Sequence, residues 1–587
     1  MSAVRYLPAL AAAVFFVGLA LFAPPFVVTL FNFIGIGSLV ALGLVVMTGL
    51  GGLTSFGQAA FVGIGAFATA WATTTLGLSP WLGLGLAILL PGAVAALLGA
   101  ATLRLGGHYL PLSTIAWGLA IYFLFPEIPG LGQHDGISAI PPISLFGLSL
   151  ADNRRIYWLI WTIVALALCL ADNLLSSREG RAIRSLRGGG VMLASLGVSL
   201  FRIRLTVFVL SAVLAGIAGW LYAHMTRFVS PSPFEIRASI EYLLMALAGG
   251  AASIYGAVIG AAFVVLLKNA IQDLLPAVTA NAAQFEIIAY SVVLILLLQH
   301  ARGGILSLIG RFMPRFPSRR RIADRGLPRR KLPARGSPLL QVEGATKRFG
   351  GLIAVHDVSF EMGAGEILGL IGPNGAGKST MFNLITGAMR ADGGRFRFLS
   401  SDVTSLSQRA RARLGIARTF QHVKLRPNMS LLDNVLLGTY LRTRSGFLAG
   451  ALRRDRAEEA VATREAMEQL ARVGLADKAE TLAGSLPLGH QRVLEVARAL
   501  AADPVLLVLD EPAAGLRKAE KEALAELLRK LRGEGVGILI VEHDMEFVMG
   551  LVDRLVVMSF GKILADGAPD AVRADASVRE AYLGSQN

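Results

Sequence analysis

The residues best suited to chemistry are a glycine-rich loop and an acidic pair far downstream. Residues 372–380 read Gly-Pro-Asn-Gly-Ala-Gly-Lys-Ser-Thr, which is the phosphate-loop pattern GxxxxGK[ST]. The backbone N–H groups of such a loop cradle phosphates at the N-terminus of a helix. Residues 505–511 read Val-Leu-Leu-Val-Leu-Asp-Glu, which predicts a buried strand that ends in two carboxylates. Together the motifs predict a site that binds and hydrolyses a nucleoside triphosphate.

Each polar residue of the two motifs has an expected part. We expect Lys378 at the outer phosphates and Ser379 on a magnesium ion. Asp510 can hold the same ion, directly or through water, and Glu511 is placed to polarise the attacking water. We expect a strand over 366–371 and a helix from Lys378. The residues expected to bind ATP in this loop are Gly372, Asn374, Gly375, Gly377, Lys378, Ser379 and Thr380.

The amino-acid composition divides the chain into an apolar half, poor in acidic residues, and a more polar half that contains the predicted nucleotide site. The chain has 587 residues, enough for two or three domains, and 54% of them are apolar whereas 16% are charged. Only nine of the 40 acidic residues lie within 1–300. Residues 1–300 are therefore predicted to form a polytopic all-α membrane domain, and residues 339–587 a water-exposed α/β domain of alternating strands and helices.

A bilayer core needs about 20 apolar residues per helix. The six arginines of 178–204 place this loop in the cytoplasm, and the loop 127–155 then lies outside. We read the first stretch as an uncleaved membrane helix rather than a signal peptide, because Pro24-Pro25 is no typical cleavage site. The expected spans are 7–23, 29–48, 57–77, 81–102, 109–126, 156–172, 205–224 and 284–300.

The apolar stretch 240–267 needs separate treatment. An even number of crossings must separate the loop 178–204 from the basic residues after 300, so this stretch either enters and returns or splits into two short helices. Gly249-Gly250 and Gly256 interrupt it midway. The hypothesis is that it lines the translocation route; the alternative is one long tilted helix. Glu241 is either a pathway carboxylate or an interfacial end residue.

A polar cluster and a basic linker complete the organisation. The cluster Thr54-Ser55-Phe56-Gly57-Gln58 is expected to face a helix partner or a cavity. The linker 301–338 carries eleven basic residues, one acid and five prolines, so we expect it to be extended, mobile and held near anionic lipids. The net charge of +16 permits nucleic-acid binding, but arginines at membrane-helix ends explain it better, and we expect no nucleic acid.

Residues 339–587 resemble the ATP-binding subunit of an ABC transporter, an α/β phosphate-loop fold with a helical subdomain. The resemblance implies that Phe349 stacks on adenine and that His543, in Val-Glu-His-Asp, is the switch histidine near the γ-phosphate. It implies that Gln421, in Arg-Thr-Phe-Gln, senses the membrane domain, takes part in catalysis and contacts magnesium.

The signature loop departs from the family pattern LSGGQ. Leu486-Pro-Leu-Gly-His490 stands there, and Gly489 is the residue implied to contact ATP across a dimer. The departures put in doubt the activity of the partner's site. Arg517 stands where the family commonly has an aspartate.

Several stretches are similar to the Liv-type family of branched-chain amino-acid uptake. In the ATPase half these are 380–387, 415–421, 510–515 and 542–545. The membrane half resembles the family's M permease at 49–65, 103–109, 177–181, 196–199 and 239–241, together with Gly249-Gly250. The family implies a second permease, a second ATP-binding subunit and a periplasmic solute-binding protein. It implies a bacterial inner-membrane location with a cytoplasmic ATPase domain, and a coupling loop at 178–204 that docks near Gln421.

Other functions fit parts of the pattern. A homodimeric ABC exporter shares the order of membrane domain before ATPase, but this chain offers eight or more short spans where exporters usually have six long helices. Relatives of the same family import urea, short amides and other small solutes. A membrane-tethered regulatory ATPase that moves no solute is disfavoured by the polar, interrupted membrane segments.

Overall fold

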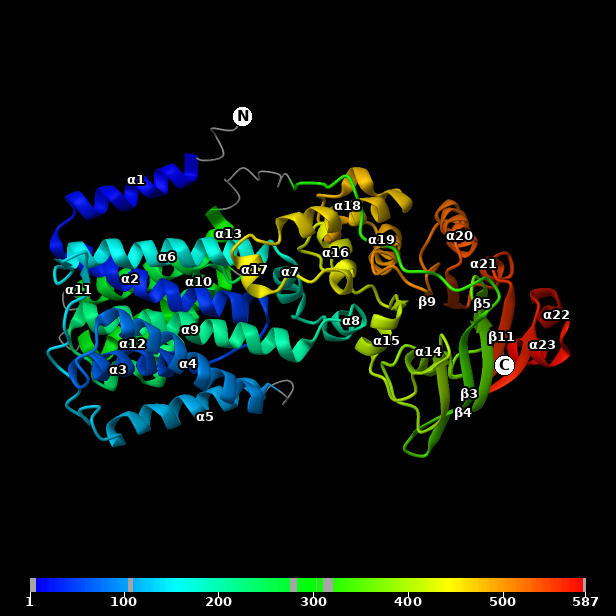
Figure 1. Cartoon of the computed structure of the whole chain (residues 1–587), viewed down its shortest axis with the longest axis horizontal. Coiled ribbons are helices and arrows are strands. Elements are labelled where there is room, and N and C mark those ends of the chain that lie inside the picture. The colour runs from blue at the N-terminus through cyan, green and yellow to red at the C-terminus, as the bar shows by residue number, and fades with distance from the viewer. Residues whose placement is uncertain (1–6, 104–108, 275–281, 302, 310–319, 584–587) are drawn as a thin grey trace. The chain divides into compact units, whose positions relative to one another are not determined.

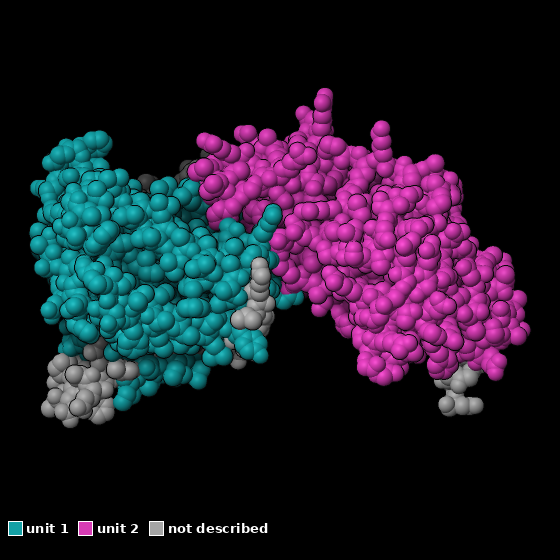
Figure 2. All heavy atoms as spheres, turned by 60° about the horizontal axis from the view of Figure 1, so that its bottom comes forward, with its two compact units in different colours: residues 1–176, 183–188, 201–317 teal, residues 177–182, 189–200, 318–587 magenta. Residues whose placement is uncertain are grey.

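The computed structural model describes the chain except for residues 1–6, 104–108, 275–281, 302, 310–319 and 584–587. The chain divides into two compact units, which Figure 2 colours separately. Unit 1 comprises residues 1–176, 183–188 and 201–317. Unit 2 comprises 318–587 together with two pieces of the arginine-rich loop, 177–182 and 189–200.

Unit 1 is a helical bundle (Figure 1). Helices occur at each of the eight expected spans. Among the described residues six helices are long and apolar enough to cross a membrane; five of them lie at expected spans, and the sixth is Gly256–Leu274, which begins in the stretch 240–267. The prediction of a multi-pass membrane protein is thereby confirmed. The helices are α1 (Leu7–Phe22), α2 (Pro25–Leu44), α3 (Gln58–Thr74), α4 (Pro80–Thr102), α5 (Tyr109–Leu124), α6 (Asn153–Leu175), α9 (Leu200–Thr226), α10 (Ile236–Gly250), α11 (Gly256–Leu274), α12 (Ala282–His300) and α13 (Ile305–Ile309).

The stretch 240–267 is two helices and not one long one. The 15 residues of α10 reach about 22 Å at 1.5 Å per residue, short of the ~30 Å bilayer core. A Cβ at Gly249 would collide with the carbonyl oxygen of Gly256, and one at Gly260 with that of Met245. The glycines therefore let the backbones of α10 and α11 touch in an antiparallel hairpin. The alternative of a single tilted helix is wrong.

The polar cluster before α3 bonds mainly to neighbouring helices. The Phe56 N–H donates to Thr114 Oγ1 of α5 at 3.1 Å, and the Ala59 N–H donates to Ser239 Oγ of α10 at 2.9 Å. Gln58 is fully buried, and its side-chain amide has no hydrogen-bond partner among the residues that the structure describes. The helix-partner interpretation thus accounts for the backbone of this segment but not for Gln58.

Unit 2 contains two sheets (Figure 1). The larger has the order β12-β11-β5-β10-β9-β8 and is parallel except for β12; the smaller is antiparallel with the order β4-β3-β6-β7. All five residues of β5, β9 and β10 are buried, as continuous apolar runs predict. The strands are β3 (Pro338–Phe349), β4 (Leu352–Gly363), β5 (Ile367–Ile371), β6 (Gly393–Phe398), β7 (Ser401–Asp402), β8 (Ile416–Arg418), β9 (Leu506–Asp510), β10 (Gly537–Val541), β11 (Arg554–Ser559) and β12 (Lys562–Gly567).

A helical subdomain interrupts the strands after β8. Its apolar core is formed by α16 (Leu431–Leu436), α18 (Arg456–Arg472) and α19 (Leu488–Leu500), with Leu431, Leu470 and Leu494 fully buried. Between β9 and β10 lies α20 (Lys518–Gly533). The fold is therefore the expected one, a helical membrane region followed by an α/β domain with a helical subdomain.

Two pieces of the arginine-rich loop pack within unit 2. The first belongs to α7 (Arg178–Ser185), where Arg181 is 1% exposed and donates twice to the Glu459 carboxylate, at 2.8 Å each. Tyr440 donates to the buried Glu179 carboxylate at 3.2 Å. The second piece carries α8 (Gly190–Ser195), after which the Gly197 carbonyl accepts from Arg409 at 3.0 Å. This loop therefore docks on the helical subdomain at α18 and on α15 (Gln408–Leu414).

The second half of the linker is extended but held in place, so the expectation of mobility is wrong for residues 320–335, named here the strap. Arg320 pairs with Asp433 at 2.7 Å, and the Arg330 N–H donates to Asp503 at 2.5 Å. Leu327 is 8% exposed and belongs to the core of the helical subdomain. Lipid proximity was the other expectation for the linker, and it stays a prediction.

Candidate nucleotide site

The glycine-rich loop joins β5 to α14 (Lys378–Ile385), as predicted from its pattern. Gly377 has a left-handed φ of 99°, and a Cβ there would collide with the Ala354 carbonyl of β4, so only glycine fits. Lys378 Nζ donates to the carbonyls of Gly372 at 2.6 Å and Pro373 at 2.9 Å. Burial lowers the pKa of Lys378, and Glu511 and Asp510 oppose that shift.

The loop presents its remaining predicted residues to solvent. Asn374, Gly375 and Ser379 are exposed, and Thr380 is partly buried. Accessible N–H groups at the start of a helix are the arrangement that binds phosphate.

Strand register brings the other motifs to the same edge. Val541 of β10 pairs with Leu370 of β5 on one side and with Asp510 of β9 on the other. Because all three strands are parallel, the phosphate loop, the acidic pair and His543 follow the same ends of adjacent strands. The order of strands thus assembles residues that lie far apart in the sequence.

Glu511 is the centre of this edge. Gln421 Nε2 donates to Glu511 Oε1 at 3.3 Å, and His543 Nδ1 lies 3.8 Å from the same oxygen. The φ of Glu511 is +47°, an uncommon value for a residue with a side chain. Its N–H donates to the Val541 carbonyl at 2.8 Å, and its own carbonyl accepts from Arg492 at 2.9 Å. The surrounding bonds hold Glu511 in a strained backbone conformation, as is common at functional sites.

Asp510 has the surroundings of a cation ligand. It is 6% exposed, and burial raises its pKa to about 6 despite the opposing charge of Arg418. Its Oδ1 is buried and has no hydrogen-bond partner within the described part of the chain. A hard cation satisfies such an oxygen, and the oxygen donors of Ser379, Asp510 and Gln421 are the kind that Mg²⁺ prefers beside phosphates. These residues fit a magnesium ion.

Two predicted residues lie away from this cluster. Phe349 ends β3, is 45% exposed, and sits at the tip of the β3–β4 hairpin, whose Ala354 touches the phosphate loop at Gly377. Gly489 is buried in the first turn of α19, and the atoms nearest to its Cβ position belong to Glu520 and Leu516. The structure therefore brings together the phosphate loop, Asp510, Glu511, Gln421 and His543. Phe349 and Gly489 do not belong to this cluster around Glu511.

Sequence reasoning missed the residues that hold these groups. Thr419 Oγ1 accepts from the Asp510 N–H at 3.1 Å. Glu542 is buried and accepts from the N–H groups of Ala513 at 2.7 Å and His543 at 3.0 Å. Its place directly before His543 was the available signal, whereas the contacts of Arg492 and Thr419 depend on the tertiary fold.

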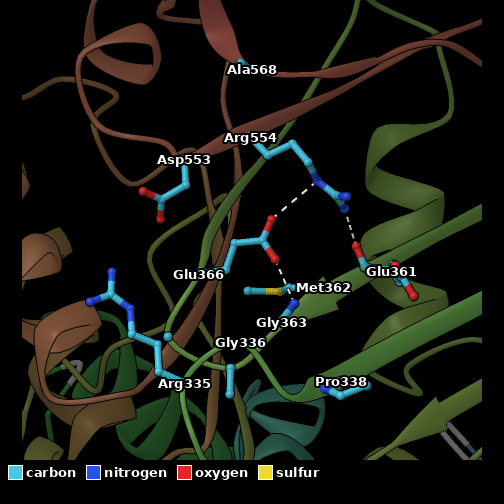
Figure 3. Close-up of a pocket in the computed structure, with 12 residues that line it drawn as sticks. Arg335, Gly336, Pro338, Glu361, Met362, Gly363, Glu366, Asp553, Arg554 and Ala568 are labelled. Atoms are coloured by element: carbon cyan, nitrogen blue, oxygen red, sulfur yellow. Dashed lines mark hydrogen bonds and ion pairs between the residues drawn. The ribbon is translucent and has the colours of Figure 1, made fainter.

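A separate hollow of about 600 Å³ lies at the starts of β5 and β11 (Figure 3). Arg554 Nε lies 3.3 Å from Glu366, whose carboxylate also accepts from the Gly363 N–H at 2.6 Å, and Arg554 donates to the Glu361 carbonyl. The phosphate loop follows the other end of β5, at Ile371. This hollow is therefore no part of the nucleotide site.

Family models match three parts of the chain. Residues 26–298 match a model described as the permease component of the branched-chain amino-acid transport system. Residues 355–514 match a model described as ABC transporter, and residues 562–586 match one described as branched-chain amino acid ATP-binding cassette transporter.

Individual relatives match the ATPase half. The high-affinity branched-chain amino acid transport ATP-binding proteins LivG of Salmonella typhimurium and of Escherichia coli K12, and BraF of Pseudomonas aeruginosa, are each 42% identical over 250 residues. The match covers 42% of this chain and 98% of each relative. Among solved structures, the ADP conformation of the ATP-binding cassette MJ1267 is 32% identical over 42% of this chain and 99% of its own, with a TM-score of 0.38.

Proposed function

This chain belongs to the branched-chain amino-acid ABC transporter family and fuses the family's permease to its ATP-binding subunit, and from that premise we propose that it imports solute. The solutes are branched-chain amino acids or related small polar molecules. They enter across the bacterial inner membrane, with the ATPase domain in the cytoplasm. Residues 1–300 are the permease domain, 301–338 the linker and 339–587 the ATPase domain.

One observation carries the proposal: Gln421 and His543 converge on the same oxygen of Glu511, in a chain that also holds a multi-pass membrane region. In this account Glu511 accepts a proton from the water that attacks the γ-phosphate, and His543 stabilises that phosphate. Lys378 and the N–H groups of Gly372, Asn374, Gly375, Gly377, Ser379 and Thr380 bind the phosphates, and Phe349 stacks on adenine.

Ser379, Asp510 and Gln421 would hold Mg²⁺, which when bound neutralises charge on the β- and γ-phosphates. The Asp510 oxygen without a partner supports this assignment. A bound cation favours the ionised form of this carboxylate and so opposes the rise in the pKa of Asp510 that burial causes.

Hydrolysis is linked to the membrane helices by the arginine-rich loop. Arg181 and Glu179 dock residues 177–182 on the helical subdomain, through Glu459 and Tyr440. Gln421 contacts Glu511 and lies between α15 and α16, so movement of the subdomain reaches both the catalytic edge and the loop. A second permease, a second ATP-binding subunit carrying its own Gly489 equivalent, and a periplasmic solute-binding protein complete the transporter.

The exporter alternative is disfavoured because α10 has 15 residues and α11 has 19, so neither helix can cross the bilayer and also extend far into the cytoplasm. The test of the proposal is co-purification of this chain with its associated subunits, followed by uptake of radiolabelled leucine into vesicles that enclose ATP. ATP-dependent accumulation is expected. Solute moving only in the opposite direction would make the chain an exporter, and ATP hydrolysis with no transport would make it a regulatory ATPase.

A further inference from the structure

Unit 1 holds a polar cavity that has no part in nucleotide binding or hydrolysis. It measures about 580 Å³ and lies between α2, the end of α9, α10 and α11. Ionisable side chains are costly in membrane helices and usually serve function. Two acids and two bases line the cavity: Glu235, Glu241, Arg237 and Lys268.

The charges around Glu241 are close but loosely paired. Lys268 Nζ of α11 lies 3.3 Å from Glu241 Oε1 of α10, and Arg237 Nε lies 3.7 Å from the same oxygen. Tight charge-assisted hydrogen bonds measure about 2.7–2.9 Å. All three side chains are partly exposed, at 22%, 37% and 50% for Glu241, Lys268 and Arg237. A ligand with groups of both signs can therefore enter between them and shorten both sets of contacts.

The rest of the wall is apolar. Phe33 and Ile36 of α2, Met245 of α10, and Val264 and Val265 of α11 face the cavity. Phe33 is 39% exposed, so its ring has surface left to bury. An aliphatic group that covers such surface gains about 25 cal/mol per Å².

We propose that this cavity is a binding site for a zwitterionic α-amino acid with an aliphatic side chain. Glu241 accepts from the ammonium group, Lys268 and Arg237 donate to the carboxylate, and the side chain packs on the apolar wall. The inference rests on the proposed import function and deepens it by naming the residues that contact the solute and the charge with which each one pairs. Urea and short amides can hydrogen-bond to these side chains, but they carry no charge and therefore form no ion pair with Glu241, Lys268 or Arg237.

The competing explanation is structural: the Glu241–Lys268 pair ties α10 to α11. The two explanations predict different changes in the affinity for each ligand when one side chain is replaced. If the cavity is a binding site, each substitution lowers the affinity only for ligands that carry the charge with which the replaced side chain pairs. A structural pair changes the affinity for every ligand together, or for none.

The test uses the full chain in lipid nanodiscs and saturation-transfer NMR, which detects weak binding. The probes are leucine, leucinamide, which lacks the carboxylate, and 4-methylpentanoate, which lacks the ammonium. Glu241→Gln should weaken the binding of leucine and leucinamide by about tenfold or more. It should not weaken the binding of 4-methylpentanoate, because loss of the Glu241 carboxylate frees Lys268 and Arg237 for the carboxylate of that probe. Lys268→Met should weaken the binding of leucine and 4-methylpentanoate, and it should not weaken the binding of leucinamide, because Glu241 then lacks its Lys268 partner. Asp273→Asn removes an exposed charge of α11 outside the cavity, so the affinity for all three probes should stay unchanged.

The inference is overturned if the wild-type chain binds no leucine, or if either substitution lowers the affinity for all three probes alike or for none. The binding measurement needs neither ATP nor partner subunits. Failure of the import proposal is seen separately, as a complete transporter that accumulates no solute.

Discussion

At the scale of single residues, chemistry depends on how Glu511 is held. Its left-handed backbone, its bond to Val541 and the Arg492 contact on its carbonyl aim the carboxylate toward Gln421 and His543. The motif pattern predicted which residues meet there. The pattern did not predict Arg492 or Thr419, because contacts to backbone atoms of a distant strand leave no regular spacing in the sequence.

Glu511→Gln should abolish turnover and preserve ATP binding. The amide keeps the size of the side chain but cannot accept a proton, so steady-state hydrolysis should fall about 10²–10⁴-fold. Phosphate release and nucleotide binding are measured on the same purified sample. The control is Glu522→Gln, the same change on an exposed residue of α20. Hydrolysis that survives in the Glu511 variant would assign the base to another group.

At the scale of elements, the prediction that differs most from the structure is the mobility of the linker at the strap. Its composition predicted a solvated, mobile chain, because eleven basic residues face one acid within 301–338. The acids that hold it, Asp433, Glu465 and Asp503, lie more than 90 residues away in the sequence. Composition measures charge within a segment, whereas the tertiary fold supplies the opposite charge. The sequence did predict α14 and β9 correctly, because the phosphate-loop motif and the apolar run that mark them consist of contiguous residues.

Leu327→Ala should loosen the strap and the helical subdomain. Leu327 packs in the subdomain core, and truncating a buried leucine costs about 2–5 kcal/mol, here about 2 because the residue enters from an extended segment. Backbone amides of α16 and α18 should then exchange their hydrogens faster than in the wild type, which hydrogen exchange on the full chain measures. Leu448→Ala, at a leucine that is 74% exposed, is the matched control. Unchanged exchange would mean that the strap adds no stability.

Arg181→Ala should uncouple hydrolysis from transport. Removing one partner of a buried ion pair costs about 3–5 kcal/mol, and here it frees residues 177–182 from Glu459. Solute moved per ATP hydrolysed should fall, while basal hydrolysis stays near that of the wild type. Arg390→Ala, at an exposed arginine, should leave the ratio unchanged. An unaltered ratio in the Arg181 variant would show that this docking does not transmit the signal.

At the scale of the whole molecule, the fold could be predicted because each unit follows a different and strong rule. Apolar length marks the membrane helices, and the counting of crossings with Gly249, Gly250 and Gly256 predicted the α10–α11 hairpin. The solute contacts could not be predicted in the same way, because Glu241 and Lys268 meet only when the hairpin closes.

Cysteine labelling tests the hairpin. In a Cys169→Ser background, Ser232→Cys before α10 and Asp273→Cys in the last turn of α11 should react with an impermeant thiol reagent from the same face of sealed vesicles. Both positions are exposed, so access through protein does not limit the reaction. Reaction from opposite faces would require an odd number of crossings and would contradict the hairpin.

The most direct measurement of the central claim is the initial rate of leucine uptake by vesicles that contain the complete transporter, with ATP enclosed on the side of the ATPase domain. The account predicts rapid accumulation by the wild type, and a rate with Glu511→Gln no higher than in wild-type vesicles without ATP. Equal accumulation by the wild type and the variant would contradict it, because solute movement would then not depend on hydrolysis in this chain.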